Sequence, residues 1–175
     1  MPLNAVALRN AIKSAMDSIS NSIGYEQGNI PSPTIYMDTL AETLRTYLIS
    51  NLTIQYTWVA YSGGGSQDPV TSFTAVISIP SLSISQKESL SQWGLEIKNK
   101  IQSNLIISAP AGFITNTGVL TGGTVSFTFS YATDYSNALL HFCNELISMI
   151  YSMSATTLSG THGSYTGSTT GFSIS

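Results

Sequence analysis

The sequence predicts an α+β domain with a mostly antiparallel sheet of about four strands and helices packed on one face of that sheet. Three observations lead to this prediction. Apolar residues recur at helical spacing in four segments and alternate with polar residues in three others, and residues 105–109 form a fourth, short apolar strand segment. The segments follow one another in the order α-α-β-β-α-β-β-α. At 175 residues the chain can also bury a core in one domain without disulfides or metals.

Two helices are predicted at the start of the chain. Residues 5–23 carry an apolar stripe at helical spacing, formed by Leu8, Ile12, Ala15, Met16, Ile19 and Ile23. Residues 35–50 form the second predicted helix, whose inward residues are Met37, Leu40, Leu44, Tyr47 and Leu48. The segment between them contains Gly and Pro residues that favour a loop.

The period then changes to two residues, which is typical of half-buried strands. Residues 52–61 alternate apolar and polar side chains, and residues 70–79 place Phe73 and Ile77 on one face. The Gly-rich stretch 63–69 between them predicts a flexible turn, so the two strands form a hairpin with a long tip.

The second half of the chain repeats this succession. A third helix is predicted over residues 85–103, opened by a capping box from Ser85 to Glu88. Strands are predicted over residues 105–109 and 124–131, and a further strand near Phe113 stays open within the loop 110–123. Two short matches, Ser50-Asn51-Leu52 with Ser103-Asn104-Leu105 and Ser72-Phe73-Thr74 with Ser126-Phe127-Thr128, lead to the hypothesis of an internal αββ duplication.

The fourth predicted helix covers residues 134–153, with Asp134 as its N-cap. It is apolar nearly all round, which predicts burial in the core or against another subunit. Residues 1–153 are therefore predicted to form one domain. Residues 154–175 are rich in Ser, Thr and Gly and are expected to form a C-terminal arm that is flexible or bound to a neighbour.

Charged residues make up only 9% of the chain, against about 25% in ordinary soluble domains. Protein interfaces are depleted in Lys, Glu and Asp and enriched in Tyr and Met, so the low charge predicts surfaces that neighbouring chains cover. A secreted or marine protein with a neutral coat is the alternative. The net charge of −3 gives no electrostatic footprint for nucleic acid.

Catalytic, cofactor-binding and metal-binding residues are all predicted to be absent. His141 lies in the middle of an apolar helix, and His162 lies in the Gly/Ser-rich tail. Neither has a second His or Cys at ligand spacing. Cys143 is the single cysteine and is expected to be a buried, inert thiol. The first residues lack a signal-peptide pattern and no apolar run is long enough to cross a membrane, so we expect synthesis in a cytoplasm.

The order of elements from Val70 to Tyr131 is a strand ending at Pro80, a capped helix with an inward Trp93, a loop and a final alternating strand. Together with the N-terminal helix and the hairpin, this order resembles the tail-terminator and tail-completion proteins of long-tailed bacteriophages, whose relatives recur in head–tail necks and tail tubes. The resemblance covers residues 5–131. It implies a ring-shaped homo-oligomer in the virion, typically a hexamer, that meets neighbouring tail and neck proteins and has no catalytic residue.

Seven residues are candidates for contacts between subunits: Tyr61, Gly64, Phe113, Leu140, Ile147, Tyr165 and Phe172. They come from the Gly-rich connections, from the fourth helix and from the C-terminal arm. Three alternatives remain open. A carbohydrate-binding or adhesin-type module would use Tyr61, Tyr165 and Phe172, another capsid or baseplate component would use similar interfaces, and an enzyme would need a concave pocket with a perturbed ionisable group.

Overall fold

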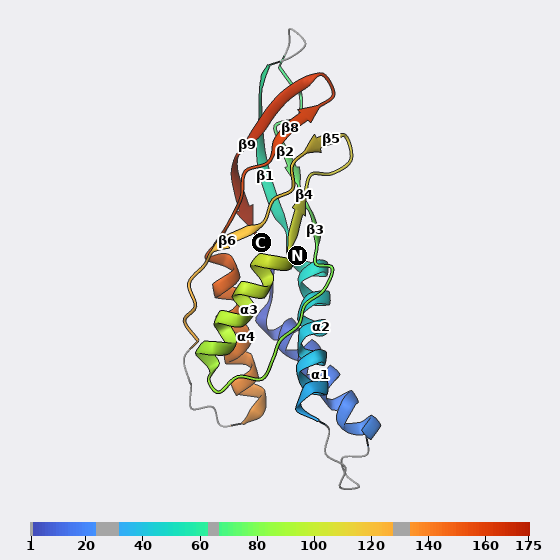
Figure 1. Ribbon diagram of the computed structural model, residues 1–175, viewed down its shortest axis with the longest axis vertical. Coiled ribbons are helices and arrows are strands. Elements are labelled where there is room, and N and C mark those ends of the chain that lie inside the picture. Colours follow the sequence, from blue (N-terminus) through green and yellow to red (C-terminus); the bar gives the residue numbers. More distant parts are fainter. Residues whose placement is uncertain (1, 24–31, 63–66, 128–133) are drawn as a thin grey trace.

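The computed structural model describes residues 2–23, 32–62, 67–127 and 134–175. Four helices lie together at one end of the molecule, and a curled antiparallel sheet forms the other end (Figure 1). The predicted α+β class and the mostly antiparallel sheet are confirmed, and the order of the elements is similar to the predicted one up to α4, after which three further strands follow. The helices gather at one end of the sheet, whereas the sequence predicted a layer over one of its faces.

All four predicted helices are present: α1 (Ala5–Ile23), α2 (Pro33–Asn51), α3 (Leu90–Asn104) and α4 (Tyr135–Tyr151). Helix α1 packs against both α2 and α4. The apolar stripe of α1 explains this packing, since Leu8 and Ile12 are almost completely buried. In α2 the buried residues include Leu44 and Leu48, as predicted.

Helix α3 begins at Leu90, so the predicted start at Ser85 is wrong. Ser89 is the N-cap, and its hydroxyl accepts a hydrogen bond from the backbone N–H of Gln92 at 3.2 Å. The Ser85 hydroxyl instead donates to Glu96 at 2.8 Å. This hydrogen bond therefore attaches the segment before α3 to the side of that helix. The N-cap of α4 is confirmed, because the Asn137 N–H donates to Asp134 at 2.8 Å.

The main sheet has five strands in the order β2-β1-β9-β8-β5. The predicted hairpin is confirmed in β1 (Ile54–Ser62) and β2 (Ser72–Thr74), which pair in antiparallel register. The open strand near Phe113 is present as β5 (Phe113–Thr115). Two smaller ladders pair β3 (Val76–Ser78) with β4 (Ile106–Ser108), and β6 (Leu120–Gly122) with β7 (Met153–Ala155).

The predicted strand at 124–131 is wrong over the residues that the structure describes. Residues 124–127 are not in a strand, and residues 128–131 lie outside the described part of the chain. The ring of Phe127 lies directly over Gly94 of α3, where a β-carbon would come within 2.2 Å of the ring. Phe127 therefore packs against helix α3 and is not part of the sheet.

The C-terminal segment also differs from the prediction, because it is part of the main sheet. Strand β9 (Tyr165–Ile174) runs antiparallel along β1, from the pair Ile54–Ile174 to the pair Ser62–Thr166. Strand β8 (Ser159–His162) follows α4 through β7 and pairs with β9 through a two-residue loop. Gly163 in that loop has φ +57°, as a type II′ hairpin turn requires.

The proposed duplication holds at one junction only. Helices α2 and α3 end alike, with the N–H of Leu52 bonded to Leu48 and that of Leu105 bonded to Ile101. The side-chain amides of Asn51 and Asn104 each donate to the carbonyl four residues earlier at 2.9 Å. The second match fails, because Phe73 lies in β2 whereas Phe127 is not in a strand.

Candidate functional site

The curl of the main sheet brings its two edge strands close together on the concave side. Phe73 of β2 and Phe113 of β5 lie at opposite ends of the strand order, yet their ring centroids are 4.7 Å apart. Trp58 of β1 meets the edge of Phe113 at 5.2 Å. These three rings fill the inside of the sheet, so its concave side is a packed core and not an open cleft.

Two glycines let the strands close around this core. A β-carbon on Gly167 of β9 would lie 2.5 Å from the carbonyl oxygen of Val59 and 2.7 Å from the Trp58 ring. A β-carbon on Gly160 of β8 would lie within 2 Å of the Ile114 carbonyl oxygen. Gly160 and Gly167 pair with each other across β8 and β9. The Gly content of the C-terminal segment, which suggested a flexible arm, therefore serves close packing.

A polar cluster lies beside the aromatic core, formed by Asp68, His162 and Trp58. The Trp58 indole N–H donates to the Asp68 carboxylate at 3.0 Å, and the Val70 N–H donates to it at 2.9 Å. His162 Nδ1 lies 3.0 Å from both carboxylate oxygens, so the imidazole donates from that nitrogen. The His162 ring stacks on Phe113 with centroids 4.4 Å apart.

The Asp68 side chain is only 1% exposed. Its burial opposes ionisation, but the hydrogen bonds from Val70, His162 and Trp58 outweigh this effect, and the pKa of Asp68 lies below its usual value. The carboxylate is thus a fixed anion whose oxygens already accept three partners. It is suited to holding neighbouring segments together rather than to accepting a proton from a substrate.

This cluster was missed by the sequence prediction, which placed His162 in a tail unable to hold a site. Residues 68 and 162 are far apart in the chain and meet only because β9 inserts between β1 and β8. One signal was available in the sequence. Asp68 is the only charged residue between Arg45 and Lys87, and it precedes Pro69 in a segment flanked by apolar strands.

The convex side of the sheet differs from the concave side, because none of the residues that the structure describes there is charged. Strand registers place thirteen outward-pointing residues on this convex face: Gln55, Thr57, Val59, Ser72, Thr74, Ile114, Ser159, Thr161, Thr166, Ser168, Gly171, Ser173 and, near the tip, Tyr61. Ile114 is 79% exposed and Tyr61 is 67% exposed. Hydroxyl groups and scattered apolar side chains therefore make up a continuous neutral surface.

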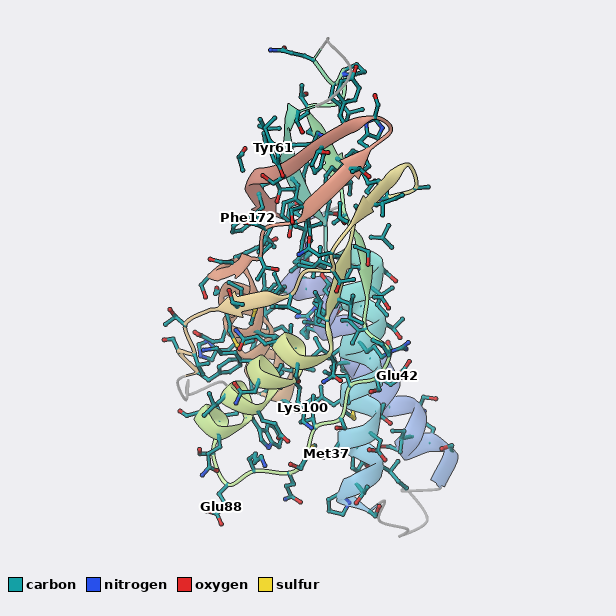
Figure 2. The ribbon with its side chains drawn as sticks, turned by 45° about the horizontal axis from the view of Figure 1, so that its top comes forward. Met37, Glu42, Tyr61, Glu88, Lys100 and Phe172 are labelled. Atoms are coloured by element: carbon teal, nitrogen blue, oxygen red, sulfur yellow. The ribbon has the colours of Figure 1, made fainter. Side chains whose placement is uncertain are left out.

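Charge is segregated along the molecule. All six basic residues lie on α1, α2 and α3 or just before α3. Among the described residues, Asp68 is the one acidic residue that belongs to the sheet end, and it is buried. Figure 2 shows Glu42, Glu88 and Lys100 on the helical end, with Tyr61 and Phe172 on the sheet. The two ends of the molecule therefore present chemically different surfaces.

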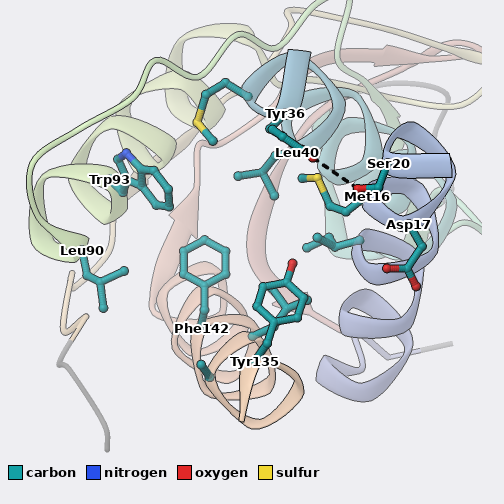
Figure 3. Close-up of a pocket in the computed structure, with 13 residues that line it drawn as sticks. Met16, Asp17, Ser20, Tyr36, Leu40, Leu90, Trp93, Tyr135 and Phe142 are labelled. Carbon is teal, nitrogen blue, oxygen red and sulfur yellow. Dashed lines mark hydrogen bonds between the residues drawn. The ribbon is translucent and has the colours of Figure 1, made fainter. Parts of the chain in front are cut away.

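The helical end contains a pocket of about 710 Å³ bordered by all four helices (Figure 3). Its lining is mostly apolar and includes Met16, Leu40, Trp93 and Phe142. At one side the hydroxyls of Ser20 and Tyr36 lie 3.2 Å apart. The pocket is on a different part of the molecule from Asp68 and His162, so it brings no reactive groups together with that pair.

The seven candidate contact residues are scattered by the fold. Ile147 is buried among the helices and Phe113 packs inside the sheet, so neither offers a free surface. Leu140 and Tyr165 are half-buried, and Gly64 lies outside the described residues. Tyr61 and Phe172 are exposed. Both lie on the sheet end, and their role as contact residues stays a prediction.

The three aromatic residues of the carbohydrate-binding alternative do not share one platform. Tyr61 and Tyr165 lie near the same end of the β1–β9 ladder, because Ser62 pairs with Thr166. Phe172 pairs with Tyr56 toward the other end of β9. Figure 2 shows the separation of Tyr61 and Phe172 along the sheet. Successive sugar rings could not stack on all three residues as a single surface.

The two other residues with potentially reactive side chains are Cys143 and His141. Burial raises the pKa of the Cys143 thiol to about 12, which fits the predicted inert cysteine. His141 Nε2 lies 3.7 Å from Glu145, one turn along α4. Among the described residues no group of three His, Cys, Asp or Glu side chains is close enough to hold a metal ion. No helix in the described ranges is long and apolar enough to cross a membrane.

The structure thus offers a packed polar cluster inside the sheet, a neutral convex face and an apolar pocket among the helices. Comparisons with family models, with curated proteins and with solved structures found no match to this chain.

Proposed function

We propose that the protein is a structural subunit that assembles with copies of itself in the tail or neck of a tailed bacteriophage. The observation that carries the proposal is the convex face, which spans five strands and has no charged residue within the described part of the chain. Neutral hydroxyl and amide groups cost far less free energy to bury than ions do. A face of this kind can be covered by a second protein without leaving an ion unpaired.

The proposal of self-association rests on the same neutrality. In a ring of identical subunits, one face of each subunit meets a different face of the next copy. The described residues of the convex face carry no charge that the neighbouring copy would have to pair, and Val59 and Ile114 supply apolar area. The charged helical end would stay in water, which gives the subunit a defined orientation in an assembly.

The placement in a phage tail or neck rests on the resemblance in element order over residues 5–131. The structure keeps the N-terminal helix, the β1–β2 hairpin and the capped helix α3 with Trp93. The final strand of that order is absent over the described residues 124–127, and β8 and β9 supply the sheet instead. By that resemblance the partners would be further copies in a ring, commonly six, and the adjoining tail or neck proteins.

The direct test is to identify and count this chain in purified virus particles from a culture that expresses it. We expect it to co-purify with tailed particles at a fixed copy number that is a multiple of the ring size. A chain that is expressed but absent from intact particles would contradict the placement in the virion. A chain recovered only in non-viral fractions and bound to glycans would instead favour the binding-module alternative.

A further inference from the structure

Among the described residues, the sheet end holds one buried acid, Asp68, and one histidine, His162, and these two residues contact each other. Asp68 belongs to the connection between β1 and β2, whereas His162 is the last residue of β8, just before the loop to β9. Trp58 adds a third hydrogen bond from the middle of β1. Strand β1 and the connection after it are therefore joined at one carboxylate to the C-terminal hairpin, which is distant from both in the sequence.

Outside this cluster, the C-terminal hairpin is held to the sheet by backbone pairing and by small side chains. Strands β8 and β9 contain Gly160, Gly167 and Gly171 and many hydroxyl residues, so they bury little apolar area of their own. Buried hydrogen bonds to a charged group contribute more than neutral ones do. The hydrogen bonds to Asp68 therefore contribute a large share of the free energy that holds the turn end of this hairpin against the sheet.

We propose that the Asp68–His162–Trp58 cluster is an acid-sensitive latch that holds the turn end of the β8–β9 hairpin against the rest of the sheet. Neutralising the Asp68 carboxylate weakens the hydrogen bonds that it accepts from His162 Nδ1–H and from the Trp58 indole N–H. The turn end of the hairpin then opens while the helical end stays folded. The latch needs no other charged group.

The direction of the pH effect follows from the lowered pKa of Asp68. A carboxyl group whose pKa is lower in the folded state stabilises that state fully above its unfolded value of 3.8. This stabilisation is lost as the pH falls through the lower, folded value. Besides His162, the titratable groups on the neighbouring strands β1 and β9 are the tyrosines Tyr56, Tyr61 and Tyr165. Burial raises the pKa of Tyr56 to about 12.

The test uses the full-length protein and the two tryptophan indole signals in ¹H–¹⁵N spectra. Trp58 contacts Asp68, whereas Trp93 lies in the helical end and serves as an internal control. In the wild type we expect the Trp58 indole signal to titrate below pH 3.8, together with loss of amide protection at residues 159–170. The amides of α1 and α4 should keep their protection over the same pH range.

The Asp68→Asn variant should show the open hairpin at neutral pH, with amide protection at residues 159–170 lowered about tenfold or more. The matched control is Asp134→Asn, which removes the same charge at an exposed helix cap where Asn also caps well. Unchanged hairpin protection in Asp68→Asn would overturn the latch. In the wild type, loss of protection in the helices at the same pH as in the hairpin would also overturn it, because the transition would then be global.

Discussion

At Gly167 the backbone of β9 lies against the indole ring of Trp58, with no room for a side chain. Gly171, four residues further along the same strand, faces open space, where the nearest atom to an added β-carbon is 3.9 Å away. The two glycines share a strand and differ only in what lies above them. Substituting each of them therefore distinguishes the free-energy cost of overpacking from the general effect of replacing a glycine in a strand.

We expect Gly167→Ala to lower the free energy of unfolding by about 1–3 kcal/mol, because the added methyl group overpacks the core. Gly171→Ala should be neutral or stabilise the protein by up to about 1 kcal/mol, since it reduces the conformational freedom of the unfolded chain. Urea unfolding followed by circular dichroism measures both values. Equal effects of the two substitutions would contradict the close approach of Trp58 and β9.

Single residues also show what the sequence could predict. Asp134 was recognisable as a helix cap, because an acidic residue directly before an apolar helix has one common local role. The role of Asp68 could not be predicted, because its partners come from β1 and from the C-terminal hairpin. Ser85 was misassigned because Ser89-Leu90-Ser91-Gln92 offers a second capping pattern four residues later.

Among the elements, helices were predicted more accurately than strands. The apolar stripes of α1 and α2 span several turns, so their period could be read from the sequence alone. Strand β9 has ten residues but alternates Thr, Ser and Gly in place of large apolar side chains. Its position depends on backbone pairing with β1 and on the glycines that admit Trp58, and neither leaves a hydrophobic pattern.

The C-terminal hairpin is therefore an integral part of the fold. We expect a chain that ends after Thr157 to lose cooperative folding, because β1 would lose its partner along β9 and the aromatic core would face water. Thermal unfolding followed by near-ultraviolet circular dichroism would report the packing around Trp58. A truncated protein that keeps the native spectrum and a cooperative transition would show that these residues are an appended arm after all.

At the scale of the whole molecule, the separation of charge is the main feature. A charged helical end and a neutral sheet end follow directly from where Lys, Arg, Asp and Glu occur in the sequence. From the low charge the sequence analysis predicted surfaces that neighbouring chains cover, and this stays a prediction. It could not predict which surface is neutral, because the convex face combines residues from five strands that only the folded topology brings together.

Val59 is a suitable position for testing whether the convex face forms an interface, since its side chain is 45% exposed near the middle of that face. Val59→Lys places a charge on that face without touching the concave core. Ser14→Lys places the same charge on an exposed position of α1 and serves as the matched control. Both variants should fold like the wild type, which thermal unfolding would verify.

The most direct test of assembly through the convex face is the native mass of the purified protein over a range of concentrations. The account predicts a closed oligomer of uniform size for the wild type and for Ser14→Lys, and a shift toward monomer for Val59→Lys, because each interface would then bury an unpaired ammonium group. A wild-type protein that stays strictly monomeric at high concentration, or a Val59→Lys oligomer as stable as the wild type, would contradict it.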